Sequence, residues 1–307
     1  MNITLALSGG GVKGFAHIGV IRVLEKAGIQ IRGLSGTSAG GLVSALYAAG
    51  YSPDEMENRL RDIDQGNFFA HMHGDGPALL GFAGVEAILG ELLGERSFDE
   101  LRLPLALTAT DLNTGLPVVI KQGRLMDGVL ATSAAPGIFP ARHISGHVLV
   151  DGGVMNPIPV AEARAFNPDI PVVAVVLSPP LGWQVDAGIN STTNATLLMT
   201  NLPLVYRLAG RLRLAQAFNI FIHSMDLSGQ MLMDKQLQLE RPDVIIRPKL
   251  GQIGIVDRVD IRQVIMTGEL AAQEALPALR KAGELRRRFS RKMSQLLTFG
   301  RRAKHGA

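Results

Sequence analysis

Short apolar segments alternate with segments of helical spacing along the first half of the chain. Residues 3–8 (ITLALS) predict a buried strand, and residues 15–27 (FAHIGVIRVLEKA) have the apolar spacing of a helix. A second strand is predicted over 29–35 and a buried helix over 39–49. This alternation is typical of an α/β fold with a mostly parallel central sheet covered by helices on both faces.

The second half is less regular. The pattern predicts, in order, a helix starting at Ser52-Pro53, hairpin strands at 103–110 and 116–121, strands at 144–151 and 170–178, a helix near 158–166, and helical stretches over 192–239 and 256–281. Residues 66–84 are rich in Gly and His and are predicted to form an irregular, mobile segment. Because no repeat or low-complexity linker interrupts the chain, we expect one domain over 1–279 and a tail over 280–307.

The composition narrows the class of protein. A chain of 307 residues with 47% apolar positions can bury one large core or two modest ones. The absence of cysteine excludes disulfides and thiolate chemistry. No apolar run approaches the roughly 18 residues of a membrane span, and the start MNITLALSGGG has no signal-peptide pattern. These features predict a cytoplasmic chain.

The positive charge is concentrated in the predicted tail. Residues 280–307 carry ten Lys or Arg against the single acid Glu284, so the tail holds +9 and residues 1–279 hold −5. Five apolar residues recur there at helical spacing: Leu285, Phe289, Met293, Leu296 and Leu297. Such a basic amphipathic helix can lie peripherally on an anionic membrane surface, or dock on the body with its charges solvated. Nucleic acid is not an expected partner, because few aromatic residues interleave with the charges.

A glycine-rich stretch, GGGVKG, lies between the first predicted strand and helix. Gly9, Gly11 and Gly14 spell G-x-G-x-x-G, but no acid ends the second strand to hold a ribose, and Phe15 follows where a P-loop needs Lys. The loop could instead bring backbone N–H groups close to a developing oxyanion. An ordinary Gly-rich turn remains the alternative for this motif taken alone.

The second motif, GTSAG, spans Gly36 to Gly40 and places Ser38 between a predicted strand and a predicted helix. G-x-S-x-G in this context is typical of a nucleophile elbow, in which a tight turn exposes the serine hydroxyl. A serine that merely caps the following helix is the alternative.

A serine nucleophile needs a base, and no histidine is suitably placed for a triad; His17, in the first predicted helix, is expected to pack or form a hydrogen bond there. Asp151 ends the apolar stretch HVLVD and precedes Gly152 and Gly153. An aspartate at a strand end in a partly desolvated cleft can have its pKa raised towards the range of a useful base. A turn-forming Asp-Gly is the alternative.

The three motifs GGGVKG (9–14), GTSAG (36–40) and DGG (151–153) together resemble the signature of bacterial patatin-like phospholipases. The stretches GFAHIGVIRVLEKAGI, LYAAGYSPDEM, LPLALTATDLNTG, ATSAAPGIFP and DGGVMNPIPV resemble this family in order and spacing as well. The resemblance is close over about residues 3–180 and looser to near 275.

The resemblance implies a patatin-type three-layer α/β/α sandwich and a Ser–Asp dyad that uses no histidine, metal or cofactor. It implies these roles: Ser38 as nucleophile, Asp151 as general base, the N–H groups of Gly10, Gly11 and Val12 as oxyanion hole, and Gly9, Lys13, Gly14, Gly36, Gly40, Gly152 and Gly153 as supporting motif residues. Two departures are mild: Lys13 stands where Arg is also common, and Gly153 where some members have Ala.

The function implied by the resemblance is a lipid acyl hydrolase that cleaves carboxylic esters of phospholipids, lysophospholipids or other fatty-acyl esters. Two alternatives are open on the same fold: a catalytically idle, lipid-binding regulatory protein, and an acyltransferase that uses an acceptor other than water.

Overall fold

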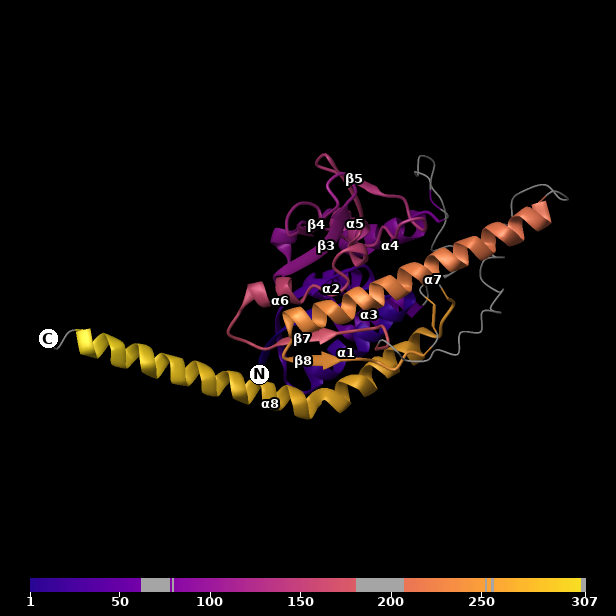
Figure 1. Ribbon diagram of the computed structural model, residues 1–307. Coiled ribbons are helices and arrows are strands. Elements are labelled where there is room, and N and C mark those ends of the chain that lie inside the picture. Colours follow the sequence, from indigo (N-terminus) through magenta and orange to yellow (C-terminus); the bar gives the residue numbers. More distant parts are fainter. Residues whose placement is uncertain (62–77, 79, 181–206, 252, 255–256, 305–307) are drawn as a thin grey trace.

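The computed structural model describes residues 1–61, 78, 80–180, 207–251, 253–254 and 257–304, with the backbone alone for 207–219 and 287–304 (Figure 1). The strands are β1 Asn2–Leu7, β2 Gln30–Gly36, β3 Leu105–Asp111, β4 Leu116–Ile120, β5 Arg142–Ile144, β6 His147–Asp151, β7 Val172–Val175 and β8 Val244–Ile246. The α-helices are α1 Phe15–Lys26, α2 Ala39–Ala48, α3 Pro53–Arg61, α4 Ala83–Leu93, α5 Leu125–Thr132, α6 Val160–Phe166, α7 Arg207–Glu240 and α8 Ile261–Lys304. Three short 3₁₀ turns accompany them: η1 Gly11–Gly14, η2 Phe98–Glu100 and η3 Gly152–Val154.

The strands form one sheet in the order β5-β6-β3-β2-β1-β7-β8, with β4 added against β3. Its centre, from β3 through β2, β1 and β7 to β8, is parallel. The antiparallel pairings lie around β3, β4, β5 and β6. The fold is therefore α/β with a mostly parallel central sheet, as the alternation of apolar segments predicts.

Both faces of the central strands are buried. Along β1, Ile3, Leu5 and Leu7 belong to the main core, which is shared with α1, α2 and α8. Ala6 faces the other way and packs in a second cluster with residues of α6 and α7. Successive side chains of a strand point to opposite faces, so these two clusters are the two interfaces of a three-layer α/β/α sandwich (Figure 1).

One edge of β3 is shared by two strands, and this arrangement determines the geometry of the site. β2 pairs with the first part of β3, as far as Gly36 opposite Leu107. β4 pairs with the opposite edge of β3, from Leu107 to Asp111. The antiparallel β6 pairs with Ala109–Asp111, and it therefore lies on the same edge as β2, beyond the end of β2. Because β6 runs back towards β2, its last residue, Asp151, lies opposite Ala109, two residues beyond the end of β2.

The crossing of α1 and α8 depends on glycine. A Cβ on Gly268 would meet the carbonyl oxygen of Ala16, and a Cβ on Gly19 would meet that of Ile265. The two backbones therefore approach as closely as the absence of these side chains permits. This crossing holds the C-terminal helix against the main layer.

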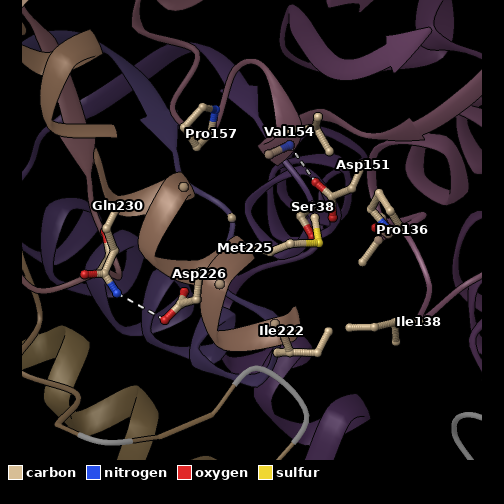
Figure 2. Close-up of a pocket in the computed structure, with 18 of the residues that line it drawn as sticks. Ser38, Pro136, Ile138, Asp151, Val154, Pro157, Ile222, Met225, Asp226 and Gln230 are labelled. Carbon is tan, nitrogen blue, oxygen red and sulfur yellow. Dashed lines mark hydrogen bonds between the residues drawn. The ribbon is translucent and has the colours of Figure 1, made fainter. Parts of the chain in front are cut away.

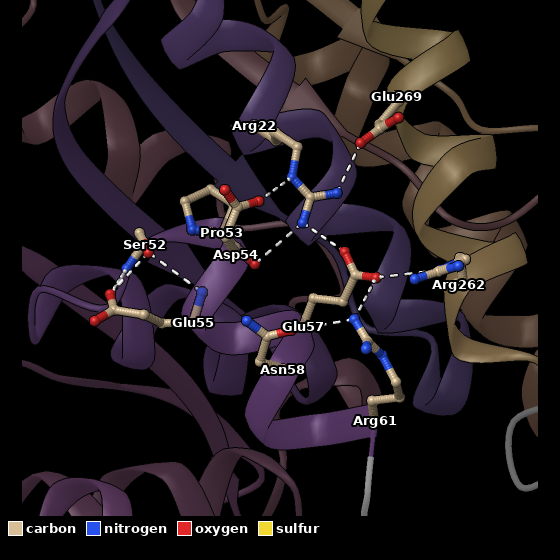
Figure 3. Close-up of polar contacts among 10 residues, drawn as sticks. All are labelled: Arg22, Ser52, Pro53, Asp54, Glu55, Glu57, Asn58, Arg61, Arg262 and Glu269. Carbon is tan, nitrogen blue, oxygen red and sulfur yellow. Dashed lines mark hydrogen bonds and ion pairs between the residues drawn. The ribbon is translucent and has the colours of Figure 1, made fainter.

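An ion-pair network around Arg22 of α1 connects this helix to α3 and α8 (Figure 3). Its guanidinium contacts Glu57 of α3 at 2.6 Å, Glu269 of α8 at 2.7 Å and Asp54 at 2.9 Å. The Arg22 and Glu57 side chains are only 10% and 12% exposed, so each charge depends on the other for compensation. The network fixes α1, α3 and α8 relative to one another.

The predicted elements up to 178 appear with ends shifted by a few residues, and α4, α5, β5 and β8 are additional to them. In the segment predicted to be irregular, 66–77 and 79 lie outside the described residues, whereas α4 begins at Ala83. Residues 192–206 also lie outside. α8 continues across the predicted boundary at residue 280, so the division into domain and tail stays a prediction. Among the described residues, no helix combines the length and apolarity that a bilayer crossing requires.

Candidate active site

Ser38 occupies a strained turn between β2 and α2. Its φ of 54° and ψ of −124° lie in a region that residues with a side chain rarely adopt. The glycines on either side are sterically required: a Cβ on Gly36 would lie 2.5 Å from the Gly40 carbonyl oxygen, and one on Gly40 would meet the carbonyl of Leu7. The Ser38 side chain makes no capping hydrogen bond to α2. This geometry is that of a nucleophile elbow rather than of a helix cap.

The hydroxyl groups of Thr37, Thr108 and Thr132 hold the elbow in place. The Ser38 N–H donates to Thr132 Oγ1 at 2.9 Å, and the Thr132 hydroxyl donates to the Thr108 carbonyl. The Thr37 hydroxyl lies 2.6 Å from that of Thr108 and donates to the Asn156 carbonyl at 2.8 Å. Sequence reasoning did not single out these residues. Their one signal is that they lie in stretches that resemble the family.

Asp151 lies beside Ser38 at the end of β6 (Figure 2). Its N–H donates to the Ala134 carbonyl at 2.9 Å, and its Oδ1 accepts the Gly153 N–H at 2.7 Å. Burial, which leaves the residue 7% exposed, raises the pKa of Asp151 to about 6, while hydrogen bonds from Ser38 and Gly153 act in the opposite direction. A carboxyl group that titrates near pH 6 can accept and return a proton at neutral pH.

Close packing also explains the glycines of the DGG motif. A Cβ on Gly152 would meet the carbonyl and hydroxyl oxygens of Thr108, and a Cβ on Gly153 would lie 3.1 Å from Asp151 Oδ1. The motif therefore lets β6 end against β3 without a side chain between them.

The glycine loop forms another wall of the same site. Gly9, Gly10, Gly11 and Lys13 line one pocket together with Ser38 and Asp151, whereas Val12 is not among the lining residues. The Gly9 N–H donates to the Pro157 carbonyl at 3.2 Å. Within the described part of the chain, no acceptor is paired with the amides of Gly10 and Gly11. Two backbone donors thus remain open beside the serine.

The packing of the loop explains its remaining glycines. A Cβ on Gly10 would lie 2.8 Å from Leu177 Cδ1, and one on Gly14 would lie 2.5 Å from the Cβ of Ala39. Lys13, which is only 6% exposed, places a cation in the pocket wall.

The pocket has a volume of about 190 Å³ and is closed on one side by α7. Its apolar lining includes Pro136, Ile138, Ile222 and Met225, and Figure 2 shows these residues grouped near Ser38. Asp226 and Gln230 lie on the other side of the view and are joined by a hydrogen bond of 3.1 Å (Figure 2). The pocket therefore has an apolar part and a polar part, and α7 contributes to both.

The histidines of the described residues lie away from the site. None of those in the described residues lines the pocket. His17 is fully buried, and burial lowers its pKa to about 4 even though a hydrogen bond to the Ser8 carbonyl opposes this. His147 is paired with Asp111 at 3.0 Å. The described residues also contain no cluster of three or more His, Cys, Asp or Glu side chains that could hold a metal ion.

A family model described as patatin-like phospholipase matches residues 5–164. The chain belongs to the patatin-like phospholipase family. The match runs from β1 into α6 and includes the glycine loop, the Ser38 elbow and the strand that ends at Asp151. The resemblance inferred from the three motifs is thereby confirmed.

Relatives within and near the patatin-like phospholipase family differ in length. An uncharacterized NTE family protein of Mycobacterium tuberculosis is 32% identical over 193 residues, which cover 62% of this chain and 53% of the relative. Patatin-like phospholipase domain-containing protein 6 of Mus musculus is 31% identical over 172 residues, or 54% of this chain and 13% of the relative. This chain therefore spans about half of the mycobacterial relative. Among solved structures, VipD from Legionella pneumophila is similar with a TM-score of 0.47 and 12% identity, covering 92% of this chain and 67% of VipD.

Proposed function

We propose that this protein is a serine acyl hydrolase that cleaves the carboxylic esters of lipids, phospholipids and lysophospholipids among them. The observation that carries the proposal is the strained Ser38 at the pocket beside a buried carboxylate whose pKa is raised to about 6. Family membership supports the class of substrate.

In the proposed mechanism, Asp151 accepts the proton of the Ser38 hydroxyl as the oxygen attacks the ester carbonyl. The open amides of Gly10 and Gly11 stabilise the negative charge that develops on the carbonyl oxygen. Asp151 then returns the proton to the leaving alcohol. In the second half-reaction the same carboxylate accepts a proton from a water molecule that attacks the acyl group, and it passes this proton to the Ser38 oxygen as the acyl group leaves.

The size of the pocket suits the reacting part of a lipid. Ligand pockets for drug-sized molecules commonly measure roughly 300–1,000 Å³, and this pocket measures about 190 Å³. We therefore expect it to receive the ester group and the parts of the substrate next to it. The apolar residues near Ile138 and Ile222 suit an acyl chain, and the polar side near Asp226 suits the alcohol portion.

Labelling with a fluorophosphonate probe, followed by hydrolysis assays on short-chain esters, lysolipids and diacyl phospholipids, tests the proposal. The wild-type protein should label and turn over esters, whereas Ser38→Ala should do neither. Ser133→Ala removes another hydroxyl from the same pocket and should retain both activities. Labelling of Ser38→Ala equal to that of the wild type would contradict the assignment.

The alternatives give different results in the same assays. A catalytically idle lipid-binding protein would neither label nor turn over any ester. An acyltransferase would label, but it would pass the acyl group to an added alcohol in preference to water. Membrane contact by the basic tail, residues 280–307, stays a prediction. Arg286 in this tail is paired with Asp243, which precedes β8, at 3.1 Å.

A further inference from the structure

His17 reaches back across the glycine loop to the residue at which the loop begins. It lies in the first turn of α1, and its Nε2 is 2.9 Å from the carbonyl oxygen of Ser8. A carbonyl can only accept a hydrogen bond, so Nε2 carries the proton and the neutral ring donates it. The side chain is fully buried. The contact therefore joins the two ends of the loop from Gly9 to Gly14.

Other hydrogen bonds also hold the loop: the Ser8 hydroxyl donates to the Gly9 carbonyl at 3.0 Å, and the Lys13 N–H donates to the Gly10 carbonyl at 3.2 Å. Neither of them holds the N–H groups of Gly10 and Gly11. Gly9, Gly10 and Gly11 have no side chains to pack, and glycine loses more conformational freedom on ordering than any other residue. The backbone at Gly11 also has a φ of 58°. The direction in which the Gly10 and Gly11 amides point therefore depends on how the ends of the loop are held.

The Ser8 end is held at every polar group. Its N–H donates to the Val175 carbonyl at 3.0 Å, and its hydroxyl accepts the Leu177 N–H at 3.0 Å. These bonds tie Ser8 to β7 and the residues that follow it. The carbonyl of Ser8 is left for His17, which supplies the tie to the helix on the other side of the loop.

We propose that His17 is a positioning residue for the oxyanion hole: its Nε2–H, held on Ser8 O, sets the orientation of the Gly10 and Gly11 amides beside Ser38. This inference rests on the proposed function and adds a role in catalysis to the expectation that His17 packs or forms a hydrogen bond in its helix. His17 touches neither substrate nor dyad. It acts through the backbone of Ser8.

The hydrogen bond from His17 to Ser8 should persist as the pH changes. Burial lowers the pKa of His17 to about 4, so the ring stays neutral over the pH range in which Asp151 titrates. His17 should therefore contribute to the rate without adding a limb to the pH–rate profile. A proton-transferring histidine would add one.

Replacement with Gln and Asn separates positioning from packing. The side-chain amide nitrogen of Gln matches the reach of His Nε2, whereas that of Asn is one bond shorter and matches Nδ1. His17→Gln should keep kcat within about 5-fold of the wild type. His17→Asn and His17→Ala should lower kcat by about 10- to 100-fold, part of the loss caused by removing a whole oxyanion donor, with KM changed less than 3-fold.

Leu24→Ala is the matched control for loss of stability. Leu24 is fully buried on the same helix and belongs to the main core. This variant should unfold more easily than the wild type but keep its kcat at temperatures where it is folded. If kcat fell as much in Leu24→Ala as in His17→Ala, general destabilisation would explain the loss and the inference would be wrong.

Hydrogen–deuterium exchange over residues 8–14 tests the inference without any enzymatic turnover. Exchange in this peptide should be faster in His17→Ala and His17→Asn than in the wild type, and near wild type in His17→Gln. If the wild type hydrolyses no ester but exchange responds in this way, the proposed function fails and the loop tie stands. Unchanged exchange in folded His17→Ala, or a His17→Gln variant as impaired as His17→Ala, would overturn the inference.

Discussion

Replacing Asp151 with Asn should abolish activity and make the protein more stable at alkaline pH. The carboxyl group is 7% exposed, and burial raises its pKa from the ordinary 3.8 to about 6. At about 1.4 kcal/mol per pH unit, this difference corresponds to about 3 kcal/mol that the folded protein loses by keeping the group ionised. Asn is uncharged, and its oxygen can still accept the Gly153 N–H.

The sign of the effect depends on pH. Below pH 3.8 the carboxyl group is protonated in both folded and unfolded chains, so it contributes no difference. Between pH 3.8 and about 6 the folded protein keeps a proton that the unfolded chain has released, and stability falls as pH rises. Above pH 6 the loss is complete. Asp151→Asn should therefore exceed the wild type by up to about 3 kcal/mol at pH 8 and by little at pH 3.5.

Urea unfolding at pH 3.5 and pH 8, combined with ester hydrolysis, measures both effects. The wild-type kcat/KM should rise with pH around a midpoint near 6, because the base acts in its ionised form. Ser38→Ala is the control: it is inactive but keeps Asp151, so its stability should still fall as pH rises, at least as much as in the wild type, because the Ser38 hydrogen bond that lowers the pKa of Asp151 is lost. A gain in Asp151→Asn of equal size at both pH values, or a loss of stability at pH 8, would refute the reasoning.

Two further predictions concern the helix crossing and the pocket wall. Gly268→Ala should destabilise the fold by about 1–3 kcal/mol through overpacking against α1, whereas Gly90→Ala, where nothing lies within 4 Å of the new Cβ, should be neutral or stabilising in the same thermal unfolding assay. Equal effects of the two would contradict the close-approach argument. Asp226→Lys reverses a charge in the pocket and should lower the kcat/KM ratio of a thiocholine ester to its neutral isostere by about 3- to 10-fold. An unchanged ratio would mean that the alcohol portion does not pass this wall.

The fold was largely predictable because its central strands are short, apolar on both faces and separated by helical segments. Residues 3–8 and 170–178 have these properties and became β1 and β7. α5 was missed because it is short and contains Gly128, which packs against Phe98. β8 was missed because three residues are too few to show a period.

The parts of the site that depend on local glycine spacing could be predicted from the sequence. The parts that depend on contacts between distant segments could not. The elbow at Ser38 follows from local sterics, and so does its strained backbone. The pairing of β6 with β3 is a long-range contact that no local pattern records. The pocket-facing side of α7 could not be distinguished from ordinary core packing in the sequence, because apolar residues occur around the helix: Ile220 is 67% exposed, whereas Met233 is buried and lines the pocket.

The shared edge of β3 fixes the distance between the two side chains of the proposed dyad. Asp151 pairs with Ala109, and Ser38 follows closely after Gly36, which pairs with Leu107, so one strand positions both reacting residues. Helices such as α7 can therefore diverge and reshape the cavity while the spacing of the two oxygens is preserved. One residue inserted between Leu107 and Ala109 would shift the register by about 3.3 Å and turn the following side chains to the opposite face.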